Sequence, residues 1–113
     1  MHELALATEI VKNVSKLAVE NKALKVTELR LELGVMSGIE KEVLDFCFDM
    51  AAKNTILEGA KLSVEKVPLK VRCQQCFSLS SPEVFNIICD KCESNDVVII
   101  KGKELKILNM EVH

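Results

Sequence analysis

Four cysteines, arranged in two pairs, are the residues of this sequence that could most clearly do chemistry. They stand as Cys73-x-x-Cys76 and Cys89-x-x-Cys92, with twelve residues between the pairs. A CxxC turn presents two thiolates on one side of a tight loop, and two such turns supply the four corners of a tetrahedron around Zn(II). Four thiolates close the coordination sphere and leave no position for water or substrate. The pattern therefore predicts a structural zinc site of the zinc-ribbon type.

Two other chemistries fit paired cysteines. A redox dithiol pair is one, although pairs at both ends of the module favour a metal. Iron in a rubredoxin-like site is the other, and an iron carrier would be red when purified. Between the pairs we expect a short hairpin whose returning strand is Val84–Ile88.

The amino terminus offers a second set of metal ligands. In Met1-His2-Glu3, the terminal amine, the His2 amide nitrogen and the His2 imidazole can close small chelate rings, and the Glu3 amide could add a further nitrogen. Deprotonated amides with imidazole favour square-planar Ni(II) or Cu(II). The first N–H groups of a helix have no intrahelical acceptor, so their use as ligands breaks no helix hydrogen bond. Taken alone the signal is weak, because one histidine at a terminus is usually just solvated.

The remaining candidates have simpler interpretations. Cys47 stands alone, and we expect a buried free thiol in preference to a reactive or ligating one. His113 is the last residue, and we expect a disordered tail in preference to a ligand. The sequence contains no Ser/His/Asp arrangement and no phosphate-binding glycine loop. We therefore predict that the protein is not an enzyme.

The first half of the chain predicts an α+β fold, which would position the amino-terminal residues and Cys47. Apolar residues recur with helical period from Leu4 to about Asn21, and they alternate with charged residues over Lys25–Leu33, as in a strand with one buried face. Ser37 followed by Glu40 predicts a capping box for a second, well-buried helix over residues 39–54. Its apolar arc is wide because Phe46 and Met50 extend it.

The second half of the chain predicts strands around the cysteine module. Lys61–Arg72 is expected to be extended, with a change of alternation next to Pro68 that suggests a bulge or a domain exit. A last strand is expected over 104–112. The prediction is two helices packed on a small, mainly antiparallel or mixed three-stranded sheet. One domain comprises residues 1–68 plus 104–113, and an inserted zinc-ribbon domain comprises residues 69–103.

Composition excludes several classes of protein. Fifteen basic against 17 acidic residues give a net charge of −2, and aromatic residues are 4% of the chain, which argues against a dedicated nucleic-acid binder. No run of apolar residues is long enough to span a bilayer, and the start of the chain lacks the basic cluster of a signal peptide. We expect a cytoplasmic protein, since CxxC pairs in a reducing compartment favour metal over disulfides.

Together the two motifs resemble the HypA/HybF family. The chain opens Met1-His2-Glu3-Leu4 and continues with the run LRLELG at 29–34, the four cysteines, and GKEL at 102–105 before the last strand. The resemblance covers the whole chain. The MHE start combined with this order of elements is much more specific than the CxxC pairs, which many zinc ribbons share. One departure is that no histidine is adjacent to the cysteines, so a mechanism in which such a histidine joins the zinc shell could not apply.

The resemblance implies a function. Members of the family are monomeric or dimeric metallochaperones that deliver Ni(II) to the [NiFe]-hydrogenase large-subunit precursor with the GTPase HypB, and in some bacteria they also serve urease maturation. By this resemblance Met1 (through its terminal amine), His2 and Glu3 are the nickel-binding residues, and the α+β domain is the nickel-binding domain. Cys73, Cys76, Cys89 and Cys92 are the zinc ligands. The alternative is a zinc-ribbon module that contacts protein or nucleic acid and has no nickel role.

Overall fold

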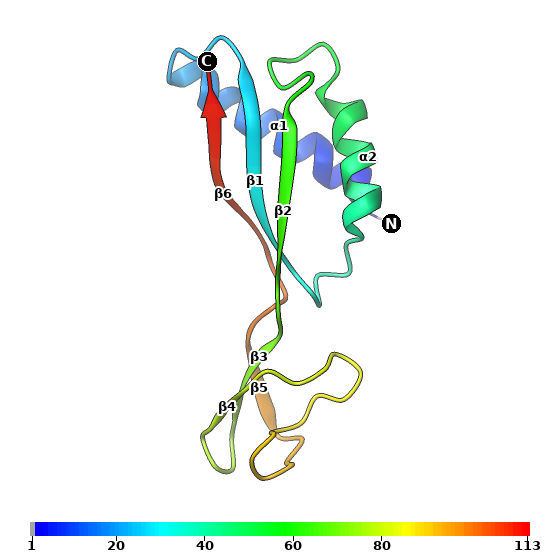
Figure 1. Ribbon diagram of the computed structural model, residues 1–113, viewed down its shortest axis with the longest axis vertical. Helices are drawn as coiled ribbons and strands as arrows, with labels where there is room; N and C mark the ends of the chain where they lie inside the picture. Colours follow the sequence, from blue (N-terminus) through cyan, green and yellow to red (C-terminus); the bar gives the residue numbers. More distant parts are fainter. Residues whose placement is uncertain (1) are drawn as a thin grey trace. The chain divides into compact units, whose positions relative to one another are not determined.

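The computed structural model describes residues 2–113 and contains two helices and six strands. Their order is α1 (Glu3–Glu20), β1 (Val26–Gly34), α2 (Lys41–Ala52), β2 (Lys61–Val67), β3 (Lys70–Cys73), β4 (Leu79–Ser80), β5 (Val97–Lys101) and β6 (Leu105–Val112) (Figure 1). The strands form two three-stranded sheets, in the orders β2-β1-β6 and β4-β3-β5. The described chain divides into two compact units, and each is described by itself.

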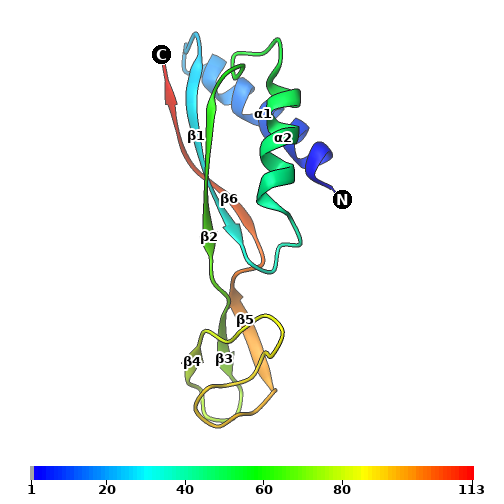
Figure 2. The same ribbon diagram turned by 45° about the vertical axis from the view of Figure 1, so that its right-hand side comes forward.

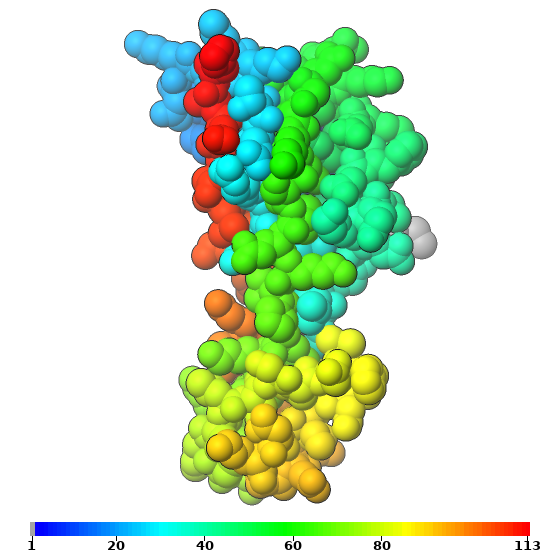
Figure 3. Space-filling model, in the orientation of Figure 1, coloured from blue at the N-terminus to red at the C-terminus, as the bar shows by residue number. Residues whose placement is uncertain are grey.

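The first unit comprises the chain up to Leu31 together with Ile39–Val64 and Ile107–His113. Strands β1 and β2 run in the same direction and β6 runs against them, so the sheet is mixed (Figures 1 and 2). The parallel pair is joined through α2, as a βαβ connection requires. Both helices lie on one face of this sheet, and Figure 3 shows its other face, where the three strands lie side by side. The predicted α+β fold is confirmed.

The core of this unit is mainly aliphatic, with Phe48 as an aromatic member. Its largest fully buried side chains include Phe48, Leu29, Leu31 and Leu44. The helical period also places Leu4 and Leu17 on the apolar face of α1, and burial there is wrong, because Leu4 is 50% exposed and Leu17 is 48% exposed. The burial of α2 was also overestimated. Its outward face carries three apolar residues that remain exposed to solvent: Val43, Phe46 and Met50.

The predicted capping box at the start of α2 is wrong. The helix begins at Lys41, and its N-cap is Glu40, whose backbone is extended at φ −90° and ψ 124° and whose side chain makes no capping bond. The backbone N–H of Glu40 instead donates to the carboxylate of Glu3 on α1, at 3.1 Å. The helix also ends early, at Ala52, because Asn54 adopts a left-handed φ of 63°. A tertiary contact therefore replaces the local cap that the sequence pattern suggested.

The second unit comprises Glu32–Gly38 and Glu65–Lys106. The expected extended segment before the cysteines splits at Pro68–Leu69 into β2 and β3, which belong to different sheets. Strand β3 pairs antiparallel with β4 on one side and with β5 on the other, and a bulge interrupts the second pairing beside Lys70. The returning strand expected at Val84–Ile88 is absent from the described chain. Residues 83–88 form turns there, and β4 and β5 complete the sheet.

Candidate metal centre

The four cysteines converge, as their spacing predicts. Their sulfur atoms all lie within 4.8 Å of one another, and the Cys73–Cys92 and Cys76–Cys89 sulfur pairs are each 3.5 Å apart. A tetrahedral zinc site with Zn–S bonds of about 2.3 Å has sulfur–sulfur separations of about 3.8 Å. The donor set and its spacing therefore fit a tetrahedral, thiolate-bound metal ion. Zn(II) would be held by Cys73, Cys76, Cys89 and Cys92 with no open coordination position.

The two CxxC turns have the same backbone structure. In the first, Cys73 N–H donates to Ser78 O at 2.9 Å, and Phe77 N–H donates to Cys73 O at 3.1 Å. In the second, Cys89 N–H donates to Ser94 O at 2.8 Å, and Glu93 N–H donates to Cys89 O at 2.9 Å. The first cysteine of each turn is buried, while the second is exposed. We call each of these CxxC turns a knuckle, and the module contains two knuckles of the same backbone structure.

Backbone N–H groups point at the sulfur of the first cysteine in each knuckle. Cys73 Sγ accepts from the N–H groups of Gln75 and Cys76 at 3.3 and 3.4 Å, and Cys89 Sγ accepts from those of Lys91 and Cys92 at 3.3 and 3.5 Å. Hydrogen-bond donors stabilise the charged thiolate and so lower the pKa of the thiol. The Cys92 N–H, followed by the Lys91 N–H, lowers the pKa of Cys89 to about 6. The thiolate is the form that binds a metal.

Two polar residues that the spacing did not indicate support the second knuckle. Ser80 is only 5% exposed. Its hydroxyl donates to Asp90 Oδ1 at 2.8 Å and accepts the Asp90 N–H at 3.1 Å, and it lies 3.9 Å from Cys89 Sγ. These bonds fix β4 against the turn that carries Cys89. No sequence signal connects Ser80 with Asp90, because the CxxC motif that contains Asp90 specifies only its two cysteines.

The residue after each knuckle adopts a left-handed backbone. Phe77 has a φ of 63°, and Glu93 has a φ of 62°. For a residue with a side chain this conformation costs roughly 1–2 kcal/mol, and glycine occupies it at no such cost. The Phe77 side chain is nevertheless 73% exposed. It is therefore a bulky apolar residue held in an unfavourable conformation without burial in return.

The structure places two of the three predicted amino-terminal ligands. Met1 lies outside the described residues. His2 is exposed and is the N-cap of α1, where its carbonyl accepts the Leu6 N–H at 2.9 Å. Glu3 is the first helical residue and is 3% exposed. Its carboxylate faces α2, because Oε2 accepts the Glu40 N–H.

The remaining candidates are also located. Cys47 is a free thiol and is 7% exposed, so its predicted burial is confirmed. The expectation of a disordered tail at His113 is wrong for its backbone, which donates to Lys25 O at 2.8 Å and accepts the Leu24 N–H at 2.9 Å. Within residues 2–113, the cysteine cluster is the one group of three or more Cys, His, Asp or Glu side chains arranged to hold a metal ion.

Fold and site together define a small α+β protein that carries a four-cysteine metal module. A family model described as "Hydrogenase/urease nickel incorporation, metallochaperone, hypA" matches residues 1–112. This chain belongs to the HypA family, which confirms the resemblance of its motifs.

Individual relatives agree with this assignment. The hydrogenase maturation factor HypA of Psychromonas ingrahamii is 39% identical over 112 residues, which cover 99% of this chain and 98% of the relative. That of Trichodesmium erythraeum is 40% identical, with coverage of 99% and 96%.

Solved structures share the fold. The solution structure of the nickel metallochaperone HypA from Helicobacter pylori matches with a TM-score of 0.72 at 23% identity, over 99% of this chain and 97% of that one. A second HypA solution structure gives 0.76 at 23% identity, over 100% and 97%. No helix among the described residues is long and apolar enough to cross a membrane.

Proposed function

We propose that this protein is a non-enzymatic nickel carrier that binds Ni(II) at its amino terminus and delivers it during [NiFe]-hydrogenase maturation. Urease is a second client that the family description supports. The partners are a HypB-type GTPase and the hydrogenase large-subunit precursor, and the compartment is the cytoplasm. The cargo ligands are the Met1 amine, His2 and Glu3. The resident metal of the four-cysteine module is Zn(II).

The observation that carries this proposal is the contrast between His2 and Glu3. His2 is exposed at the start of α1, so its imidazole is available to a metal ion. The first N–H groups of a helix have no intrahelical acceptor and can be deprotonated for nickel without loss of a helix bond. The Glu3 carboxylate is buried against Glu40, so Glu3 contributes its amide nitrogen and anchors the chelating segment through its side chain.

Exposure also suits a site that must give up its metal. Protons compete with nickel for imidazole, amide and amine nitrogens, so binding weakens as the pH falls from 8 to 6. An unchanged affinity over this interval would contradict release by protonation.

We also propose two domains. Residues 1–68 plus 104–113 form the nickel-binding domain, and residues 69–103 form the zinc-ribbon domain.

The test is calorimetric titration of Ni(II) into the zinc-loaded protein with its native amino terminus. We expect about one nickel per chain, lost in His2→Ala and retained in His113→Ala. The second variant is a matched control, because these are the only two histidines in the chain. Equal nickel binding by His2→Ala and the parent would refute the amino-terminal assignment and leave a zinc-ribbon interaction module as the function.

A further inference from the structure

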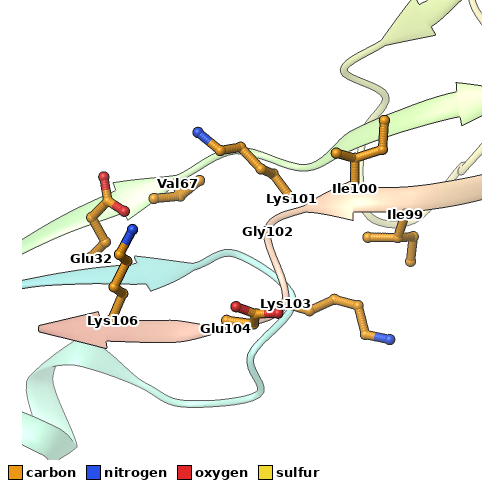
Figure 4. Close-up of a pocket in the computed structure, with 9 residues that line it drawn as sticks. All are labelled: Glu32, Val67, Ile99, Ile100, Lys101, Gly102, Lys103, Glu104 and Lys106. Atoms are coloured by element: carbon orange, nitrogen blue, oxygen red, sulfur yellow. The ribbon is translucent and has the colours of Figure 1, made fainter.

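The sheet of the second unit has one buried face and one open face. Toward the metal site it presents Val71, Cys73 and Ser80, which are all buried. Arg72 lies between Leu79 on β4 and Val98 on β5 in the register, so these three side chains share the opposite face. Figure 4 shows Ile100 and Lys101 pointing to one side of β5 and Ile99 to the other. We name the open side the outer face; it comprises Lys70, Arg72, Leu79, Val98, Ile100 and Lys101.

The outer face combines exposed apolar surface with positive charge. Leu79 is 49% exposed, Val98 is 47% exposed and Ile100 is 43% exposed. Lys70, Arg72 and Lys101 are exposed as well, and none of them has an ion-pair partner in the part of the chain that the structure describes. Lys70 and Lys101 are directly opposite one another in the register, an arrangement of like charges that is unfavourable without an anion.

Positive charge is concentrated on this sheet. Strands β3, β4 and β5 contain three cations and no acidic residue, although the whole chain has a net charge of −2. A groove of about 530 Å³ borders Ile100 and Lys101, but its other side carries Glu32 and Glu104, so its charge is mixed. The uniformly positive surface is therefore the outer face itself, and charge complementarity requires an acidic partner.

Phe77 adds an independent observation. It lies in the connection between β3 and β4, two residues before Leu79, and holds a left-handed backbone while 73% exposed. Glycine would relieve the backbone at no loss of buried surface, so packing within this chain does not explain a phenylalanine here. Exposed aromatic side chains and arginine are the residue types that dominate binding energy at protein interfaces.

We propose that the outer face together with Phe77 is a docking site for an acidic, partly apolar segment of a partner protein. This goes beyond nickel binding, and His2 takes no part in it. The occupant is a protein, because aliphatic side chains make up half of the outer face and none of its six residues is aromatic. A nucleic-acid surface uses several stacking aromatics and a basic groove.

The test uses the zinc-loaded, full-length protein labelled with ¹⁵N. The probes are a synthetic peptide that alternates Glu with Leu, the same peptide with Lys in place of Glu, and a single-stranded oligothymidine. We expect the acidic peptide alone to bind and to shift the amide signals of Arg72, Phe77, Leu79 and Val98. Failure of the acidic peptide to bind, shifts confined to other segments, or preferential binding of the oligonucleotide to this face overturns the proposal.

Two pairs of variants separate binding from folding. Arg72→Glu should weaken peptide binding at least tenfold, whereas Lys12→Glu, an equal charge change on an exposed residue of α1, should leave it unchanged. Phe77→Gly should weaken binding about tenfold while the melting temperature stays the same or rises. Glu93→Gly makes the same backbone change in the other knuckle and should not alter affinity. A lower melting temperature in Phe77→Gly, or unchanged affinity in Arg72→Glu, would overturn the assignment.

Discussion

The carboxylate of Glu3, on the first turn of α1, accepts the backbone N–H of Glu40, the residue from which α2 starts, at 3.1 Å. The bond therefore ties the segment that carries His2 to the start of the second helix. Glu40 is the N-cap of α2 and makes no side-chain cap itself, and Glu3 accepts its backbone N–H as the third helical residue does in a capping box. The geometry gives the Glu3 side chain a positioning role beside the proposed nickel site.

Glu3→Ala should therefore destabilise the protein, because it leaves the Glu40 N–H without this acceptor. We expect the melting temperature to fall by a few degrees, and Glu3→Gln, whose amide oxygen can still accept, to lose less. Nickel affinity should fall in Glu3→Ala but not disappear, since the Glu3 amide remains. Thermal unfolding and calorimetry on the same samples check both points. Complete loss of nickel binding in the stable Gln variant would instead make the carboxylate a ligand.

A second prediction concerns the contact between Gly34 and Gly102. A Cβ on Gly34 would lie 2.3 Å from the Gly102 carbonyl carbon, and a Cβ on Gly102 would lie 2.8 Å from Leu69 Cα, with φ at 108°. Every neighbour is backbone, so neither alanine can be accommodated by a side-chain movement. We expect Gly34→Ala and Gly102→Ala each to cost about 2–4 kcal/mol of unfolding free energy.

Gly59→Ala is the matched control for the glycine contact. Gly59 also has a positive φ, of 79°, but its Cβ would meet no atom within 4 Å. Only the backbone strain remains, and the cost should be about 1 kcal/mol. Denaturant unfolding of the three variants separates the two effects. Equal costs at all three positions would show that the close approach contributes nothing.

The third prediction concerns removal of the resident metal. The second unit has few buried apolar residues. Its buried aliphatic side chains are Leu33, Leu69 and Val71, beside Cys73 and Cys89, and only the last two of these three lie near the cysteine module in sequence. Folding of such a module depends on the metal. A strong chelator should abolish hydrogen-exchange protection over residues 70–101 and leave α1 and α2 protected. Retained protection over 70–101 in the metal-free protein would contradict this dependence.

The sequence predicted the parts of this molecule that depend on local pattern. Helical period located α1, and alternation located the buried leucines of β1, because each pattern reflects one face packed on a core. The CxxC pairs predicted the cluster, because a knuckle brings its own ligands together. The sequence pattern did not predict the true start of α2, because the N–H of its N-cap residue Glu40 is bonded by Glu3, thirty-seven residues away in the chain. The sequence pattern did not predict that Phe46 and its neighbours on α2 are exposed, because an apolar residue type does not reveal whether its side chain faces the core or solvent.

The last prediction is a pH effect on the first unit. Ser63 on β2 donates its hydroxyl to Glu28 Oε2 at 2.8 Å, and Arg30 lies 3.0 Å from Glu28 Oε1. The Ser63 hydrogen bond, followed by the positive charge of Arg30, lowers the pKa of Glu28. A carboxyl whose pKa is lower in the folded state contributes stability above its unfolded pKa, and this stability is lost as the pH falls through the folded pKa.

Ser63→Ala removes the main cause of this shift, so the Glu28 pKa should rise toward its ordinary value and acid unfolding should begin at a higher pH. A ¹³C titration of the Glu28 carboxyl in both proteins measures the first effect, and acid denaturation followed by circular dichroism measures the second. Thr8→Ala is a control, because the Thr8 hydroxyl bonds a backbone carbonyl of α1 and no carboxylate. If Ser63→Ala leaves the Glu28 pKa unchanged, the hydroxyl is not its cause, and the neighbouring Arg30, Lys61 and Glu111 account for the shift.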